Sequence, residues 1–80
     1  MAVRATVMEH LPFTIETDPS YTAIAATLSQ YGRPVAFFYR NLQASERRHC
    51  SVEKEAYAIV EAIRRWRHYL MGRLFTIITD

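Results

Sequence analysis

The stretch FTIETD at residues 13–18 is nearly repeated as FTIITD at residues 75–80, with five of six positions identical. Each copy alternates apolar and polar residues, which is the period of a half-buried β-strand. Each copy also ends in an aspartate, Asp18 in the first and Asp80 in the second. Because matching patterns suit neighbouring places in one sheet, we predict that the two aspartates lie at adjacent strand ends.

The residues between these stretches predict two further strands and one long helix. Residues 21–30 are rich in Thr, Ile and Ala, and residues 35–39 are aromatic and β-branched, as strands are. Residues 31–34 predict a turn, and residues 41–50 a polar loop. Short connections favour an antiparallel meander, and a helical crossover returns the last strand parallel to the first. The expected fold is therefore α/β in the order β-β-β-α-β. The connections do not choose the edge for the last strand, and strand order 3-2-1-4 is inferred from the repeated text.

The helix is predicted to begin with Ser51 as its N-cap and to end near Gly72. Glu53 and Glu55 fall in its first turn, where the helix dipole favours anions. Glu55 would lie at the margin of the apolar stripe, and Glu61 on the opposite, solvated face. The expected stripe consists of apolar residues at helical spacing: Val52, Ala56, Ile59, Val60, Ile63, Trp66 and Leu70.

Chain lengths bring a third carboxylate to the two strand ends. From Glu55 to Met71 a helix runs ~24 Å, and a strand over residues 74–80 returns ~20 Å, so Asp80 should finish near Glu55. Three clustered carboxylates repel one another unless cations neutralise them, and Mg²⁺ or Mn²⁺ prefers such oxygen ligands. Taken singly, Asp18 before a proline suits a turn and Glu55 suits a helix dipole, so only the joint geometry favours a metal site.

Composition limits the other possibilities. The chain has 80 residues, 50% hydrophobic and 22% charged, with a net charge of +2, which suits one small globular domain. Nine of its ten basic residues are arginine, a side chain that forks onto phosphate. Arg47 and Arg48 in the predicted loop could contact a nucleic-acid backbone or could simply be solvated. The later cluster at residues 64–68 is better interpreted as favourable charge near a helix C-terminus.

Cysteine content and hydropathy predict the compartment. Cys50 is the single cysteine and cannot form an internal disulfide, so we expect an intracellular protein. No apolar run approaches the roughly 18 residues that a membrane span needs. The first residues lack the pattern of a secretory signal.

A family resemblance rests on the motifs already quoted and on three others. Over about residues 12–80, after a lead-in of residues 1–11, the chain resembles the N-terminal half of the ribonuclease H domain in gypsy-type LTR retrotransposon reverse transcriptases. The motifs are FTIETDPS at 13–20, LSQ at 28–30, GRPVAF at 32–37, EKEAYAIVEA at 53–62, and WRHYLMGRLFTIITD at 66–80.

The resemblance implies Mg²⁺-dependent hydrolysis of the RNA strand in an RNA–DNA hybrid, as part of a pol polyprotein. It implies Asp18, Glu55 and Asp80 as catalytic and metal-binding acids that hold two Mg²⁺ ions in the intact domain, with Mn²⁺ as a substitute. Ser20, together with Arg47 and Arg48, is a candidate for nucleic-acid contact. Expected partners are the hybrid and the remaining polyprotein, with no membrane. The expected location is the cytoplasm, particles of the element, or the nucleus.

Several positions depart from the family pattern. Pro19 stands where a small residue is usual, and Ala23 and Ala25 stand where glycines are usual. The family's fourth acid would lie beyond Asp80, so the 80-residue chain alone is expected to be weak or inactive. The alternative is a non-catalytic, degenerate or co-opted remnant that binds nucleic acid or protein. An unrelated small α/β interaction module is a third interpretation.

Overall fold

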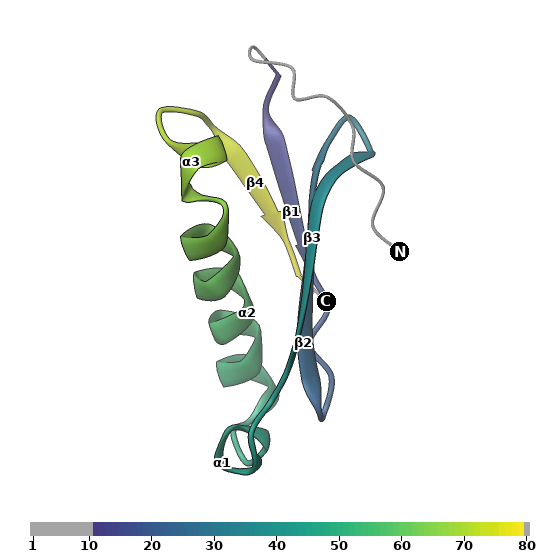
Figure 1. The fold of residues 1–80 in the computed structure, drawn as a ribbon, viewed down its shortest axis with the longest axis vertical. Coiled ribbons are helices and arrows are strands. Elements are labelled where there is room, and N and C mark those ends of the chain that lie inside the picture. Colours follow the sequence, from purple (N-terminus) through teal and green to yellow (C-terminus); the bar gives the residue numbers. More distant parts are fainter. Residues whose placement is uncertain (1–10, 80) are drawn as a thin grey trace.

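The computed structural model describes residues 11–79, which contain a four-stranded sheet. Figure 1 shows the helices along one side of the sheet. The strands are β1 (Phe13–Thr17), β2 (Ala23–Gln30), β3 (Arg33–Asn41) and β4 (Phe75–Ile78). The helices are α1 (Ala44–Arg47), α2 (Ser51–Arg65) and α3 (Arg67–Leu70). The predicted lead-in lies outside these residues except for Leu11.

The sheet has the predicted order, β3-β2-β1-β4. β1 pairs antiparallel with β2, β2 antiparallel with β3, and β1 parallel with β4. The parallel register runs from Phe13 opposite Phe75 to Glu16 opposite Ile78, so corresponding positions of the repeated text face each other. The inference from the repeat is confirmed.

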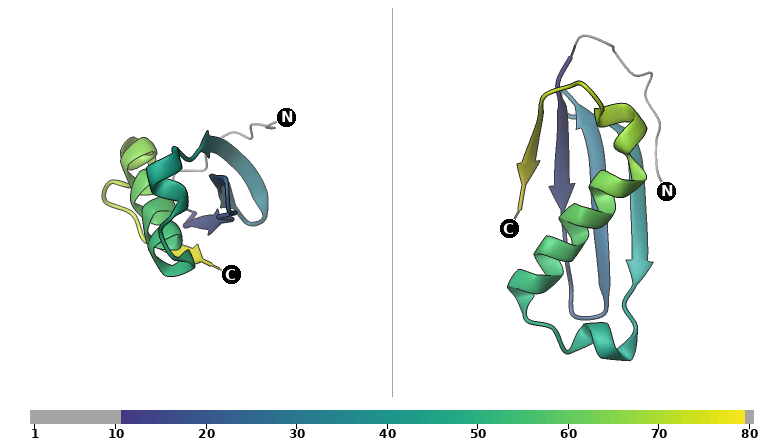
Figure 2. Two further views of the ribbon diagram at one scale, coloured as in Figure 1. Left: turned by 90° about the horizontal axis from the view of Figure 1, so that it is seen from below. Right: turned by 90° about the vertical axis from the view of Figure 1, so that its left-hand side faces the viewer.

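Alternation along the strands decides which face is buried. Phe13 and Ile15 are fully buried, and Phe75 and Ile77 beside them pack against the same core. Figure 2 shows α2 lying obliquely across this face. Trp66 completes the core against Phe38, with 5.4 Å between ring centroids. In the part of the chain that the structure describes, no helix is long and apolar enough to cross a membrane.

The predicted stripe is confirmed only in part: Trp66 and Leu70 are buried and Ile63 packs against the core, but the buried face of α2 itself differs. Its buried residues are Lys54, Ala58 and Ala62, whereas Val52 is 72% exposed and Val60 53% exposed. Small side chains spaced four residues apart let the helix backbone approach the sheet closely, and this geometry turns the valines outward. Apolar character alone therefore predicted burial wrongly for the two valines.

Glu61 also differs from its expected solvated position. Its side chain is only 17% exposed, and its carboxylate accepts from Arg65 at 3.4 Å and lies 3.9 Å from Arg64. These ion pairs hold two arginines of the predicted basic cluster on the helix itself. Arg65 also lies over the Phe38 ring at 4.8 Å, which supports the structural interpretation of that cluster.

The corrected helix face makes a direct prediction. Ala58→Leu adds bulk to a filled core and should lower the free energy of unfolding by about 1–3 kcal/mol. Ala56→Leu makes the same change at an exposed position and should stay within about 0.5 kcal/mol of the original chain. Urea denaturation of the two variants measures the difference, and equal losses would show that the assigned face is wrong.

The helix boundaries also need correction. The N-cap of α2 is Cys50 rather than Ser51, and the predicted single helix divides at Trp66, where φ is −106° and α3 begins. The glycine stop is placed as expected, since α3 ends at Leu70 and Gly72 follows with φ +74°. The Trp66 side chain at this break is buried in the core.

The predicted polar loop at residues 41–50 contains the short helix α1. The backbone N–H of Gln43 donates to the Glu46 carboxylate at 2.8 Å, and Arg40 lies 3.2 Å from the same carboxylate. The Gln43 contact, followed by those of Tyr57 and Arg40, holds the pKa of Glu46 below its usual value. Local capping therefore ordered a segment whose composition suggested a loop.

One strand is shorter than predicted and the next is longer. β2 begins at Ala23 rather than at residue 21, while β3 extends beyond the predicted residues 35–39 to Arg33–Asn41. The turn between them shortens to Tyr31 and Gly32, with φ values of 51° and 73°. Two successive left-handed residues make a tight hairpin turn, so the residues on either side stay paired.

Candidate active site

Asp18 lies just after β1, at the start of a closed turn. Its backbone N–H donates to the Ala25 carbonyl at 2.9 Å, and the N–H of Ser20 donates to the Ala23 carbonyl at 2.8 Å. Pro19 falls between these two donors, so its missing N–H breaks neither bond. The sheet therefore accommodates this departure from the family pattern and leaves Asp18 exposed at the strand end.

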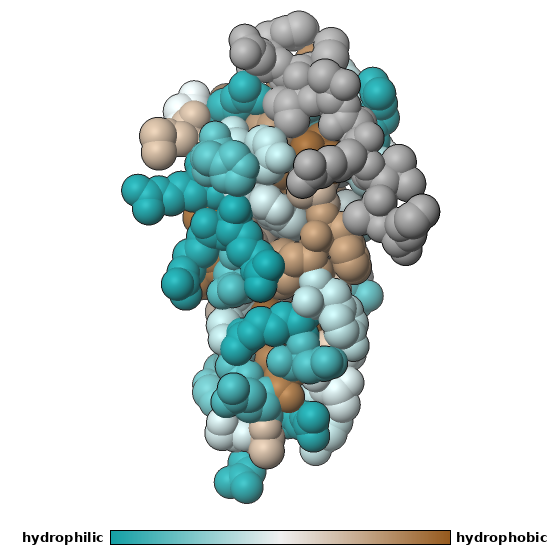
Figure 3. All heavy atoms as spheres, in the orientation of Figure 1, coloured by the Kyte–Doolittle hydropathy of each residue, from teal (hydrophilic) through white to brown (hydrophobic). Residues whose placement is uncertain are grey.

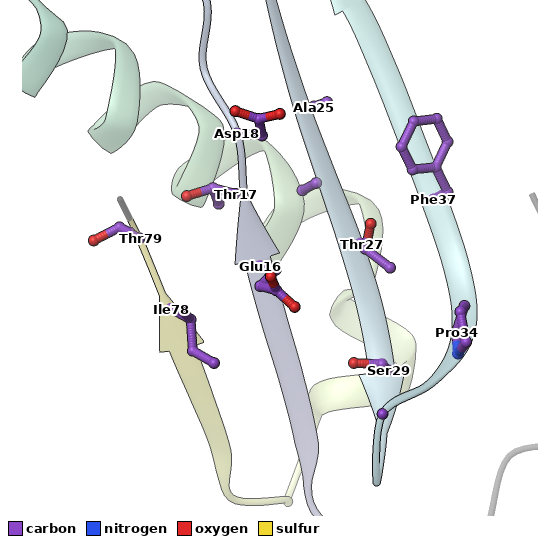
Figure 4. A pocket seen from close by; sticks show the side chains of 12 residues that line it. Glu16, Thr17, Asp18, Ala25, Thr27, Ser29, Pro34, Phe37, Ile78 and Thr79 are labelled. Atoms are coloured by element: carbon purple, nitrogen blue, oxygen red, sulfur yellow. The ribbon is translucent and has the colours of Figure 1, made fainter.

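A hollow of about 420 Å³ lies on the sheet face opposite α2 (Figure 4). Glu16 lines it from β1, Thr27 from β2, Phe37 from β3 and Ile78 from β4, and Asp18 and Thr79 line it just after the ends of β1 and β4. Side chains from all four strands thus surround a single open depression. Its carboxylates and hydroxyls give it a hydrogen-bonding lining that can accommodate a polar ligand.

The parallel register carries the end of β4 to the end of β1. Paired residues differ by 62 in number, from 13 and 75 to 16 and 78, and extending this register places Thr79 beside Thr17. Figure 4 shows both side chains in this region. Asp80, the next residue, lies outside the described residues, so its predicted role stays a prediction.

Glu55 reaches the same end of the molecule through α2. Its neighbour Lys54 donates from Nζ to the Tyr21 carbonyl at 3.2 Å, which ties the first turn of α2 to the turn that follows Asp18. Glu55 itself is half-buried and does not line the hollow. The structure therefore brings the helix start and the strand end together, but of Asp18 and Glu55 only Asp18 lines the depression.

The donor chemistry of this pair suits Mg²⁺. Within residues 11–79, the carboxylates of Asp18 and Glu55 form no hydrogen bond or ion pair, so their oxygens remain free to bind a hard cation. No group of three acidic, histidine or cysteine side chains in these residues is placed to hold a metal. The described residues thus supply two carboxylates and not a complete metal centre.

Glu16 is a polar lining residue that our sequence analysis did not consider. It is exposed and contributes to the hollow together with Asp18. The available signal was strand alternation, because residues two apart on a strand share a face. Its carboxylate adds negative charge close to the proposed metal-binding aspartate.

The predicted nucleic-acid contacts lie at the same end as the site. Figure 1 shows α1, which carries Arg47, at the end where the β1–β2 turn lies. Arg47 and Arg48 are exposed and form no ion pair with any residue of the described range. Ser20 instead closes the turn, accepting from the Ala23 N–H at 3.1 Å and donating to its carbonyl at 3.2 Å. Figure 3 shows many hydrophilic side chains on the helical side of the molecule.

Cys50 is an exposed free thiol at the start of α2, as expected of a lone cysteine. It donates to the Glu53 carboxylate at 3.2 Å, and His49 lies 2.9 Å from the other oxygen of that carboxylate. The Cys50 contacts, followed by His49, hold the pKa of Glu53 below its usual value. Glu53 is thus engaged at the helix start, whereas Glu55, one position beyond Lys54, is left free.

A mixed sheet in this order, with one long helix against it and acids at the β1 and α2 termini, defines a ribonuclease H-like domain. Residues 9–80 match the model of the RNase H-like domain found in reverse transcriptase. The chain belongs to this family.

Curated relatives agree with this assignment. The chain is 46% identical over 68 residues to the retrovirus-related Pol polyprotein from transposon 297 of Drosophila melanogaster, and 40% identical over 70 residues to that from transposon gypsy of the same organism. These matches cover 85% and 86% of the chain but only 6% and 7% of the relatives. The chain therefore spans only a small part of the length of these polyproteins.

Solved structures support the fold independently. The native prototype foamy virus protease-reverse transcriptase matches with a TM-score of 0.86 at 13% identity, over 95% of this chain and 10% of that one. The foamy viral protease-reverse transcriptase in complex with an RNA/DNA hybrid matches with a TM-score of 0.81 at 14% identity, over 89% and 10%. The predicted fold class is confirmed.

Proposed function

We propose that this chain supplies part of an active site that hydrolyses the RNA strand of RNA–DNA hybrids, within a larger reverse transcriptase polyprotein. The observation that carries the proposal is the meeting of the start of α2 with the end of β1 in a chain of this family. Asp18 and Glu55 stand at those two positions. A solved structure of the same fold was determined in complex with an RNA/DNA hybrid, which supports this substrate class.

Asp18 and Glu55 would bind Mg²⁺ together with Asp80. Mn²⁺ is the alternative ion. Bound Mg²⁺ would stabilise the negative charge that develops as a phosphodiester bond is hydrolysed. The rigid turn after β1 orients Asp18, and α2 orients Glu55. Preorganised ligands matter because groups already in place need no reorganisation during the reaction.

Arg47 and Arg48 would hold the nucleic-acid backbone at this end of the molecule. Both are exposed, and arginine forks onto phosphate oxygens. Such contacts fix the register of a duplex without reading its sequence. Their role is to place the RNA strand beside the carboxylates.

A chimera tests this function. The matched region of the transposon 297 polyprotein is replaced by residues 9–80 of this chain, which keeps the rest of the domain intact. We expect the chimera to cleave the RNA strand of a labelled hybrid with Mg²⁺ and to lose cleavage with EDTA. The 80-residue chain alone should cleave weakly or not at all. An inactive chimera that is folded would contradict the proposal, and robust turnover by the short chain would contradict the second expectation.

A non-catalytic binding module is the second candidate. It is favoured by the departures from the family pattern at Ala23 and Ala25, which stand where glycines are usual. A Mg²⁺ titration of the chain followed by NMR separates the two candidates. Shifts centred on Asp18 and Glu55 support the metal site, whereas shifts elsewhere, or none, support the binding module.

A further inference from the structure

We infer that Lys54 is a positioning residue that sets the spacing between Asp18 and Glu55 by fastening the first turn of α2 to the β1–β2 turn. The inference rests on the proposed function, because it assigns Lys54 a role towards the same pair of carboxylates. It gives a role to a residue to which neither the sequence motifs nor the comparisons assign one.

Lys54 is an unusual member of the core face. It is only 7% exposed, although lysine is almost never fully buried without a partner. Its Nζ donates to the Tyr21 carbonyl at 3.2 Å and lies 4.7 Å from the centroid of the Tyr21 ring. A backbone acceptor and an aromatic face together thus hold the ammonium group.

Lys54 and its contact residue Tyr21 each lie close in sequence to one of the two carboxylates. Glu55 is the next residue, and Tyr21 lies three residues after Asp18. The intervening turn is stiffened by the Asp18 bond to Ala25 and by the paired bonds between Ser20 and Ala23. A movement of the α2 start relative to this turn would therefore change the spacing of the two acids.

Lys54 does not act by neutralising these acids directly. Its Nζ forms no ion pair with any carboxylate of residues 11–79. A cation near a metal site weakens Mg²⁺ binding by repulsion, whereas a residue that spaces the ligands strengthens it. Removal of the ammonium group therefore has opposite effects under the two roles, and the sign of the change identifies the role.

Lys54→Met in the 80-residue chain tests the inference, because methionine keeps an unbranched apolar stem and loses the donor. Mg²⁺ binding is followed through the amide NMR signals of Asp18 and Glu55. We expect the Kd to rise about tenfold, the scale seen when groups that orient metal ligands are removed. An unchanged or lower Kd would overturn the inference.

Two further variants keep the result interpretable. Tyr21→Ala removes the ring but keeps the carbonyl, at a residue that is 73% exposed, and should raise the Kd in the same direction by a smaller factor. Arg67→Met removes one exposed cation near the other end of the helices and should leave the Kd unchanged. If Tyr21→Ala and Lys54→Met both bind as the original chain does, the ammonium contact has no positioning role.

A metal-free measurement separates this inference from the proposed function. NOE contacts between the Lys54 side chain and the Tyr21 ring should be present in the original chain, and NOEs between the two backbone segments should weaken in Lys54→Met. If the original chain shows no Mg²⁺ shifts at Asp18 and Glu55, the metal site and the inference both fail. If it binds Mg²⁺ and Lys54→Met binds equally well, only the inference fails.

Discussion

Asp18→Asn is expected to weaken Mg²⁺ binding at least about 100-fold, because groups that merely support metal ligands already contribute 10–100-fold. Asparagine has nearly the same shape but lacks the negative charge of the ligand. Asp18 is exposed and its structural hydrogen bond comes from its backbone, so the free energy of unfolding should change by less than about 0.5 kcal/mol. In the transposon 297 chimera, hybrid cleavage should fall by a similar factor or more.

Glu16→Gln is the matched control for charge. Glu16 lines the same hollow two residues earlier, about 7 Å away along the strand. A carboxylate and a doubly charged ion at that distance in water interact by roughly 1.2 kcal/mol, a factor of about 7 in Kd. If both substitutions weaken Mg²⁺ binding equally, negative potential and not ligation by Asp18 explains the affinity. Isothermal titration with MgCl₂ distinguishes these outcomes.

Trp66→Ala is expected to remove a large part of the stability of the chain. The indole is buried, packs against Phe38, and fills the space where α2 gives way to α3. Removal of a buried tryptophan costs about 3–5 kcal/mol, while a chain of this length has roughly 4–12 kcal/mol of net stability in total. Far-UV circular dichroism in increasing urea measures the loss, since the variant has no tryptophan fluorescence.

Tyr39→Ala serves as the control for aromatic loss. Tyr39 lies on β3 but is exposed, so its removal should cost far less than that of Trp66. Similar urea midpoints for the two variants would contradict the assigned core. A midpoint shift confined to Trp66→Ala would confirm that the helix break is part of the packing.

Sequence reasoning predicted the sheet well because its information is local and repeated. The FTIxTD text at 13–18 and 75–80 carries the strand period, and the short connections before the helix leave few arrangements for the sheet. The same reasoning was wrong at Val52 and Val60, which it selected for burial, whereas the buried residues of α2 are Lys54, Ala58 and Ala62. Hydropathy ranks side chains, but close packing of a helix on a sheet favours small ones.

The candidate site was predictable only in part. The end of β1 and the start of α2 follow from local pattern, so Asp18 and Glu55 could be selected before the fold was known. The contribution of Glu16 depends on which sheet face remains open, and the contact of Lys54 with Tyr21 joins residues 33 positions apart. Neither feature can be predicted from the sequence pattern of a single strand or helix.

The order of strands and the kind of fold were thus determined by the sequence itself, because strand period, turn residues and a repeated motif act over a few neighbouring residues. Tertiary structure alone decided which edge of α2 is buried, how Pro19 is accommodated, and which carbonyl receives the Lys54 ammonium. These outcomes depend on the distance between elements packed together, and that distance arises only when the whole core is filled.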